Sequence, residues 1–244
     1  MHTFSEFYSA RIDESFLNKY EKEANKIAEL IKGGDRDRAV DMLTDVYNKL
    51  LPQLVAAEAE LKKTLETAAR ANKLQNFSIA TRIKPLKSTI NKVIDRKKKL
   101  SALGDLVAGS IYAREEGAPK KLYDHIRRKM KVVDFEAKEK GGDKVFGYYG
   151  TYHLGIELPS GVIGEIQLMT KKMSVYKDAA HAIYSANRAK APGDVAKGDL
   201  QQSKKFFHIA NSGRRVREAL EELGIDDFAM LESMVNALFE SDAE

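Results

Sequence analysis

The pattern of apolar and polar positions divides the chain into a helical first part and a mixed remainder. Over residues 14–72, apolar side chains recur at three- and four-residue spacing, which is typical of amphipathic helices. Gly33 and Gly34 end the first helix, and Asp35 can cap the second. Pro52 permits a third helix that ends near residue 71. The pattern therefore predicts three helices before the first strand.

The second part of the chain shows short apolar runs that predict strands. Two strands are expected over residues 104–112 and 132–138, separated by a helix that opens at Pro119. Two more are expected over residues 148–158 and 162–169. The tripeptide Pro159-Ser160-Gly161 joins them and indicates a hairpin.

Further helices are predicted around these strands. Ser88 is expected to cap a basic helix that runs to about Lys99, and Thr170 a helix that runs to about Arg188. Two helices over residues 200–223 and 227–240 finish the chain. The predicted fold class is α+β, a small mixed β-sheet surrounded by helices with a helical N-terminal extension. The predicted divisions are residues 1–58, the helical extension; 59–190, the sheet-containing domain; and 191–244, C-terminal helices packed on it.

Composition excludes several classes of protein. The chain has 244 residues, of which 43% are apolar and 32% charged, as in ordinary globular domains. It has no cysteine, which excludes a disulfide framework, a thiolate zinc site and a cysteine nucleophile. No apolar run approaches the roughly 20 residues of a membrane-spanning helix, and the first residues lack a secretory pattern. We therefore expect a cytoplasmic protein without a membrane partner.

Positive charge is concentrated in one segment of the chain. The net charge is only +5, but residues 82–99 hold eight basic residues against a single acid, Asp95. The basic residues are Arg82, Lys84, Lys87, Lys92, Arg96, Lys97, Lys98 and Lys99. This asymmetry predicts an anionic ligand.

The basic segment has the local structure expected of a phosphate site. On the predicted helix, Lys92, Arg96 and Lys99 share one face by their spacing. The first helical turn offers free backbone N–H groups to an anion. Arg82 and Lys84 lie in an extended segment leading into this helix. The competing interpretation is a solvated charged face, which we prefer for residues 97–99.

Two carboxylates stand out near the predicted strands. Asp105 begins an apolar strand, and Glu165 shares one strand face with Gln167 by alternation. If the two strands are neighbours, the carboxylates can share a metal ion such as Mg²⁺. Otherwise Asp105 caps a turn, and Glu165 is an exposed side chain.

A third group of residues combines an aromatic ring with polar side chains. Tyr149, Thr151 and His153 lie on one face of a predicted strand, and His181 and Tyr184 are one helical turn apart. The ring can stack a base while the hydroxyl and imidazole bind its ribose or phosphates. The alternative is that these residues belong to the core.

Together and in this order, the motifs resemble the synthetase domain of the RelA/SpoT family, over about residues 61–184. The family's basic ATP motif corresponds to Arg82, Lys84, Ser88 and Lys92. Its Tyr-x-Ser-x-His motif corresponds to Tyr149, Thr151 and His153, and its Glu-Ile-Gln motif to residues 165–167. Its trailing His-x-x-Tyr corresponds to His181 and Tyr184.

The resemblance implies a nucleotidyltransferase-like fold and transfer of pyrophosphate from ATP to the 3′-hydroxyl of GDP or GTP. It assigns ATP binding to the basic motif, with Arg96 added. It assigns Mg²⁺ binding and catalysis to Asp105 and Glu165. It implies that the acceptor is bound by Tyr149, Thr151, His153, Lys144, Gln167 and His181, with Tyr149 stacking on guanine.

The chain departs from the family pattern at several positions. Ser110 and Met169 stand where the family carries arginine, and Gly109 is one place late. Tyr148 replaces the glycine that normally precedes the tyrosine motif. Arg114 or Lys144 would have to supply the missing positive charge.

Three functions remain open at this point. The chain is expected to be a small stand-alone synthetase that makes (p)ppGpp. The first alternative is the toxic branch of the family, which acts on the 3′ end of tRNA and has an antitoxin as partner. The second is a catalytically degenerate module that binds nucleotides. A homo-oligomer is a further expected partner state, through the N-terminal helices.

Overall fold

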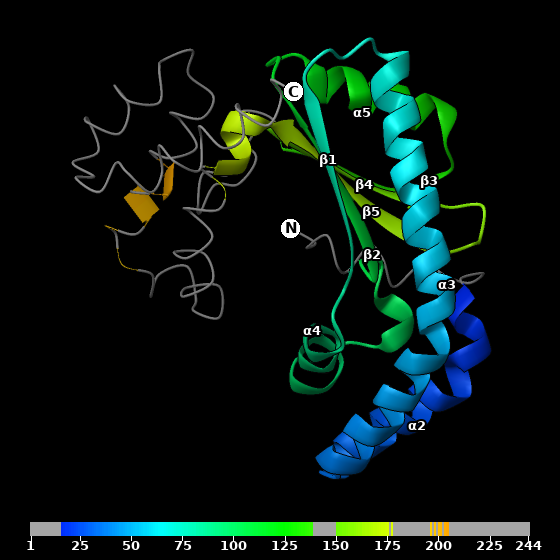
Figure 1. Cartoon of the computed structure of the whole chain (residues 1–244). Helices are drawn as coiled ribbons and strands as arrows, with labels where there is room; N and C mark the ends of the chain where they lie inside the picture. The colour runs from blue at the N-terminus through cyan, green and yellow to red at the C-terminus, as the bar shows by residue number, and fades with distance from the viewer. Residues whose placement is uncertain are drawn as a thin grey trace.

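The computed structural model describes residues 16–138 and 150–175, together with residues 177, 196, 198, 200, 201, 203 and 204. Within this part, a five-stranded mixed sheet is flanked by helices and preceded by a helical region (Figure 1). The predicted α+β class is confirmed. The helices predicted over residues 200–223 and 227–240 lie almost wholly outside the described residues.

The helical region contains fewer breaks than predicted. It consists of η2 (Phe16–Tyr20), α2 (Glu21–Lys32) and α3 (Arg36–Ala71). Asp35 caps α3 as expected, because its side chain accepts a hydrogen bond from the backbone N–H of Arg38 at 3.3 Å. The predicted start of a separate helix at Pro52 is wrong, because α3 continues through Pro52 and is 36 residues long in total. Pro52 lies on the exposed side, and the buried apolar face on both sides of it holds the helix together.

The sheet has the order β1-β2-β5-β4-β3. Its strands are β1 (Phe77–Ile83), β2 (Val107–Ala113), β3 (Val132–Lys138), β4 (Thr151–Glu157) and β5 (Ile163–Thr170). β2 and β5 are parallel, and the other three neighbouring pairs are antiparallel. The sequence predicted four of these strands, β2, β3, β4 and β5. For β1 it predicted only an extended segment around Arg82 and Lys84, at the end of the strand.

The segment between β1 and β2 differs from its prediction. Ser88 does not cap a helix, because α4 (Leu86–Ile90) already begins after Pro85. A five-residue π-helix, η3 (Asn91–Asp95), continues it. The backbone of Lys97 is left-handed, with φ of 54°, so the helical path ends well before Lys99. The short η4 (Leu100–Ala102) then leads to β2.

The helices after the strands begin as predicted. α5 (Ala118–Lys129) follows β2 and has Pro119 in its first turn. At the end of β5, the backbone N–H of Met173 donates to Oγ1 of Thr170 at 3.0 Å, which is the predicted cap. Most of the helix predicted to reach residue 188 lies outside the described residues.

The core lies between α3 and one face of the sheet. A Cβ built on Gly109 would lie 2.6 Å from Cδ1 of Leu65, and one on Gly164 would lie 3.4 Å from Cδ1 of Leu61. Gly109 therefore allows α3 to approach β2 closely. α5 packs on the same face, where the rings of Tyr123 and Tyr152 are 4.9 Å apart.

One tether links the hairpin to this core. At the β4–β5 turn, both the backbone N–H and the hydroxyl of Ser160 donate to Oε2 of Glu60 on α3, at 3.1 and 2.7 Å. The proposed division at residue 58 stays a prediction, although α3 crosses it. No helix in the described part of the chain is long and apolar enough to cross a membrane.

Candidate active site

Asp105 is the centre of the charged cluster that the structure forms. Its Oδ2 lies 2.9 Å from Nζ of Lys84 and 2.6 Å from Nζ of Lys92. Lys84 directly follows β1 and Lys92 lies in η3, so two separate segments converge on one carboxylate oxygen. The side chain of Lys84 is 10% exposed, that of Lys92 is 29% exposed and that of Asp105 is 17% exposed. The cluster is therefore largely shielded from water.

The two oxygens of Asp105 have different environments. Oδ2 receives both lysines, whereas Oδ1 is buried and accepts no hydrogen bond from the described residues. Burial alone would raise the pKa of Asp105, but the charges of Lys92 and Lys84 outweigh it and hold that pKa below its usual value. Asp105 is therefore ionised, and one of its oxygens can accept a further ligand.

The backbone around Lys84 is fixed by two hydrogen bonds. Its N–H donates to the carbonyl of Leu106 at 2.8 Å, which extends the β1–β2 ladder by one residue. The hydroxyl of Tyr47 donates to its carbonyl, also at 2.8 Å. Tyr47 lies on the buried face of α3. Its position would not have been found from spacing, because the partner is a backbone atom 37 residues away.

Glu165 lies in β5 on the sheet face opposite α3. In the register of the sheet, Arg82 pairs with Ala108, and Ala108 pairs with Glu165. Ala108 is small, so Arg82 and Glu165 face the same space from two strands. Burial raises the pKa of Glu165, and the charge of Asp105 raises it further. The hydrogen bond from Gln167 and the charges of Lys92 and Arg82 oppose this rise in part.

The Glu165→Gln variant should be more stable than the wild type at high pH. Folding raises the pKa of Glu165. Below the unfolded-state pKa of about 4.3, the side chain is protonated in both states and does not lower the free energy of unfolding. As the pH rises through the folded-state pKa, ionisation of the buried side chain lowers the free energy of unfolding. We expect the variant to be more stable than the wild type at pH 8 and equally stable near pH 4. Urea unfolding in EDTA measures the difference. The exposed Glu115→Gln variant is the control, and equal gains at both pH values would contradict the prediction.

Glu165 is surrounded by polar side chains from β4 and β5. Nε2 of Gln167 donates to Oε1 of Glu165 at 3.1 Å, and Nδ1 of His153 lies 3.9 Å from the same oxygen. Nζ of Lys177 donates to Oε1 of Gln167, and so orients that amide. Lys177 was not among the predicted site residues; its only sequence signal is its place in the helix after Thr170.

Comparison with known proteins finds a family model that matches part of the chain. Residues 81–189 match the family model described as "Region found in RelA / SpoT proteins". The chain contains a RelA/SpoT-like synthetase domain. The match begins at β1 and includes Lys84, Lys92, Asp105 and Glu165. No curated protein matches the sequence significantly.

Solved structures share the fold of this synthetase domain. Small alarmone synthetase 2 from Bacillus subtilis has 22% sequence identity and a TM-score of 0.53, with 76% of this chain and 100% of that chain covered. Small alarmone synthetase 1 from the same organism, bound to its product pppGpp, has 19% identity and a TM-score of 0.52, with 74% and 98% covered. The Type VI effector Tas1, in complex with its immunity protein, has 18% identity and a TM-score of 0.53, with 68% and 96% covered.

Some predicted site residues of the synthetase domain lie apart from the cluster. Ser88 and Arg96 are exposed, and within the described residues no side-chain contact joins them to Asp105 or Glu165. Thr151 is fully buried at the start of β4, with no hydrogen-bond partner for its hydroxyl among the described residues. Four predicted residues lie outside the described residues: Tyr149, Lys144, His181 and Tyr184.

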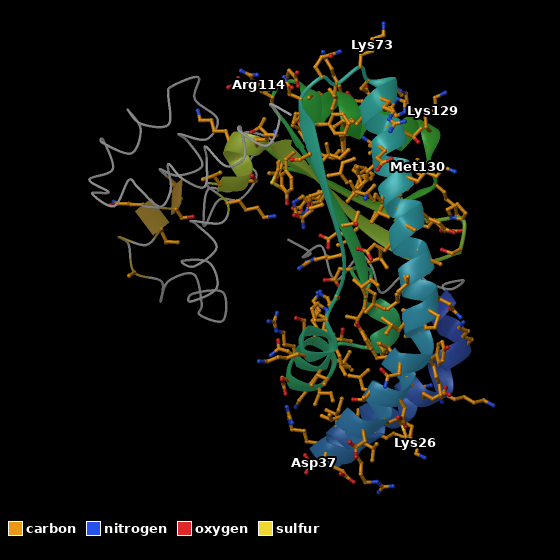
Figure 2. All side chains as sticks on the ribbon, in the orientation of Figure 1. Lys26, Asp37, Lys73, Arg114, Lys129 and Met130 are labelled. Carbon is orange, nitrogen blue, oxygen red and sulfur yellow. The ribbon has the colours of Figure 1, made fainter. Side chains whose placement is uncertain are left out.

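Two departures from the family pattern, Ser110 and Met169, fall on the same face of the sheet as Glu165. Ser110 pairs with Gln167 across β2 and β5, and Met169 is fully buried two residues further along β5. Arg114, labelled in Figure 2, directly follows the last residue of β2. Asp105 precedes the first residue of this strand, so the two residues lie beyond its opposite ends. Arg114 is therefore not part of the Asp105 cluster.

Proposed function

We propose that this chain is a nucleotide pyrophosphokinase that transfers the β,γ-pyrophosphate of ATP to the 3′-hydroxyl of GDP or GTP. The observation that carries this proposal is the convergence of Lys84 and Lys92 on Asp105 beside the buried Glu165. Cations next to carboxylates are the groups that bind and activate a polyphosphate. The similarity to an alarmone synthetase solved with pppGpp supports the choice of a guanine nucleotide.

Asp105 and Glu165 are the residues that would hold Mg²⁺. The buried Oδ1 of Asp105 lacks a donor among the described residues, as expected of an atom that takes a metal or its water. No group of three or more acidic or histidine residues gathers in that part of the chain, and Mg²⁺ commonly uses one or two carboxylates with substrate phosphates and water. When bound, the ion would neutralise charge on the phosphate oxygens.

The cations would bind ATP in the same space. Lys84 and Lys92 supply ammonium groups that meet at a single point, which favours a compact anion such as a phosphate group. Arg82 faces Glu165 across Ala108 and can bind a second phosphate through its planar fork. Positioning and charge neutralisation would supply most of the rate.

Glu165 would take the proton from the attacking hydroxyl. Its raised pKa makes it a stronger base than an exposed glutamate, and His153 and Gln167 hold its side chain in place. The 3′-oxygen then forms a bond to the β-phosphorus, and the bond from this phosphorus to the oxygen shared with the α-phosphate breaks. AMP leaves with that oxygen. Thr151, His153 and Gln167 would bind the acceptor; Tyr149, Lys144 and His181 remain predictions.

The 3′ end of tRNA is the alternative acceptor. The observation in its favour is the exposed run at the end of η3, where Arg96, Lys97 and Lys99 face solvent outside any helix. Such a run can contact a nucleic-acid backbone. In this case an antitoxin would be the expected protein partner.

Transfer of label from ATP tests the proposal. Purified protein would be incubated with Mg²⁺ and ATP labelled at the γ-phosphate, with GDP, GTP, ATP or deacylated tRNA in separate reactions. Label on GDP or GTP is the expected result. Label on tRNA alone would replace the proposal by the alternative. Absence of transfer to every acceptor, with folded protein, would overturn catalysis and leave the nucleotide-binding module.

A further inference from the structure

A lysine on the helix that follows β5 is directed at the protein rather than at solvent. Residues 171–175 and 177 are helical, and the hydroxyl of Thr170 caps the first turn. Lys177 shares a helix face with Met173 and Ser174, because residues three and four apart are neighbours on a helix. Met173 is 1% exposed and Ser174 is 8% exposed, and Lys177 itself is half-buried. The side chain of Lys177 is therefore on the buried side of this helix.

The ammonium group of Lys177 is linked to Glu165 through the side chain of Gln167. Nζ of Lys177 donates a hydrogen bond to Oε1 of Gln167, and Nε2 of Gln167 donates to Oε1 of Glu165 at 3.1 Å. A hydrogen bond from an ammonium group is stronger than one between two neutral groups. The Gln167 amide thus connects a cation to the carboxylate that would take the proton in the proposed reaction.

The two ends of the Gln167 amide have opposite requirements. Its oxygen accepts hydrogen bonds, whereas its nitrogen only donates them. In the observed orientation, the oxygen meets an ammonium group and the nitrogen meets a carboxylate. A turned amide would place its oxygen against the carboxylate of Glu165 and its NH2 group against the ammonium of Lys177, and both contacts would be repulsive. Lys177 therefore disfavours the turned orientation.

Neither strand partner of Gln167 in the described sheet carries a fixed positive charge. Gln167 pairs with Ser110 on β2 and with His153 on β4. Met169, the next residue of β5 on this face, is also uncharged. At Ser110 and Met169 the family carries arginine. The positive charge next to Gln167 comes instead from the helix, through Lys177.

We propose that Lys177 is a positioning residue, which locks the Gln167 amide in the orientation that donates to Glu165. This inference rests on the proposed function, because it concerns Glu165 as the base for the attacking hydroxyl. With the amide locked, Gln167 holds one oxygen of Glu165 and keeps the carboxylate in a fixed direction. Without Lys177, the amide also adopts the turned orientation, in which its oxygen repels the carboxylate and displaces it from the attacking hydroxyl.

A double-mutant cycle tests whether Lys177 acts through Gln167. The proteins compared are the wild type, Lys177→Met, Gln167→Met and the double variant. Methionine keeps an unbranched chain but lacks the ammonium or amide group. Lys121→Met is the control, because Lys121 is exposed on α5, which packs on the opposite face of the sheet.

The cycle is measured by transfer of label from ATP to the acceptor found for the wild type. Both kcat and the KM for ATP would be determined, and single-turnover rates with excess enzyme would extend the measurement to slow variants. Circular dichroism checks that each variant is folded. Lys177→Ala repeats the test if the methionine variant does not fold.

Lys177→Met is expected to lower kcat about tenfold, because the base is misplaced. The KM for ATP should change by less than about twofold. ATP would be bound by Lys84 and Lys92, which converge on Asp105 and do not depend on the lock. In the Gln167→Met background, Lys177→Met should lower kcat by less than about twofold, since the amide on which it acts is gone. Lys121→Met should behave as the wild type.

Three results would overturn the positioning role. An unchanged kcat for Lys177→Met, with an active wild type, would remove Lys177 from the site and leave the proposed function intact. An equal loss with and without the Gln167 amide would mean that Lys177 acts directly on the substrate or on the fold. A folded wild type that transfers no label to any acceptor would overturn the proposed function, and this role with it.

Discussion

The Asp105→Asn variant is expected to lose at least about 100-fold of the pyrophosphate-transfer activity. Asparagine keeps the shape of the side chain but removes the charge on which Lys84 and Lys92 converge. It also removes the anionic Oδ1 that is free to accept a metal ligand. Initial rates at saturating Mg²⁺ and ATP, with the best acceptor, measure the effect.

This loss has to be separated from unfolding. Leaving two largely buried ammonium groups without their carboxylate destabilises a protein, so the variant should be assayed at a temperature where circular dichroism shows it folded. Asp124→Asn is the matched control, because Asp124 forms an exposed ion pair with Lys120 at 3.1 Å. A folded Asp105→Asn protein with activity near that of the control would remove Asp105 from the proposed site.

The Leu61→Ala variant is expected to lower the free energy of unfolding by about 2–5 kcal/mol. Leu61 is fully buried on α3, and its side chain contacts the positions where Gly109 and Gly164 have no Cβ. The glycines cannot fill the space that a shorter side chain would leave, so a cavity would open between the helix and the parallel strands. Chemical denaturation at pH 7 measures the loss.

A variant of conserved volume is the control for this prediction. Leu61→Met keeps most of the contacts and should cost less than about 1.5 kcal/mol. A loss below 1 kcal/mol for Leu61→Ala would mean that α3 is not the main support of the sheet. Because typical domains are stable by only about 5–15 kcal/mol, a loss at the upper end would leave part of the variant unfolded at 37 °C.

Much of the site could be predicted because its signals are local. Alternation along one strand places Glu165 and Gln167 on the same face, and the structure confirms this in the register with β4. The order of the motifs from Arg82 to Gln167 predicts the RelA/SpoT-like domain, and the family model matches residues 81–189. Cap positions such as Asp35 and Thr170 were also predictable, because a capping side chain acts on its own helix.

The features that the sequence did not predict depend on contacts between segments that are far apart in the chain. Strand patterns do not state which strands are neighbours, so the β2–β5 pairing that brings Asp105 close to Glu165 had to come from the structure. The continuity of α3 through Pro52 reflects packing rather than local propensity. The role of Ser88 was misjudged because Pro85 already begins the helix.

The parallel pairing of β2 and β5 also determines when the charged cluster can form. A parallel pair needs a long crossover, and here α5, β3 and β4 lie between the two strands in the chain. The hairpin of β4 and β5 and the β1–β2 pair involve closer segments, so their loop-closure entropy is lower. We therefore expect the β2–β5 contact to form later than the other strand pairs of the described sheet. In a partly folded chain of this kind, Asp105 and Glu165 would lie on separate pieces, and the free-energy cost of bringing their charges together would arise only as the sheet is completed.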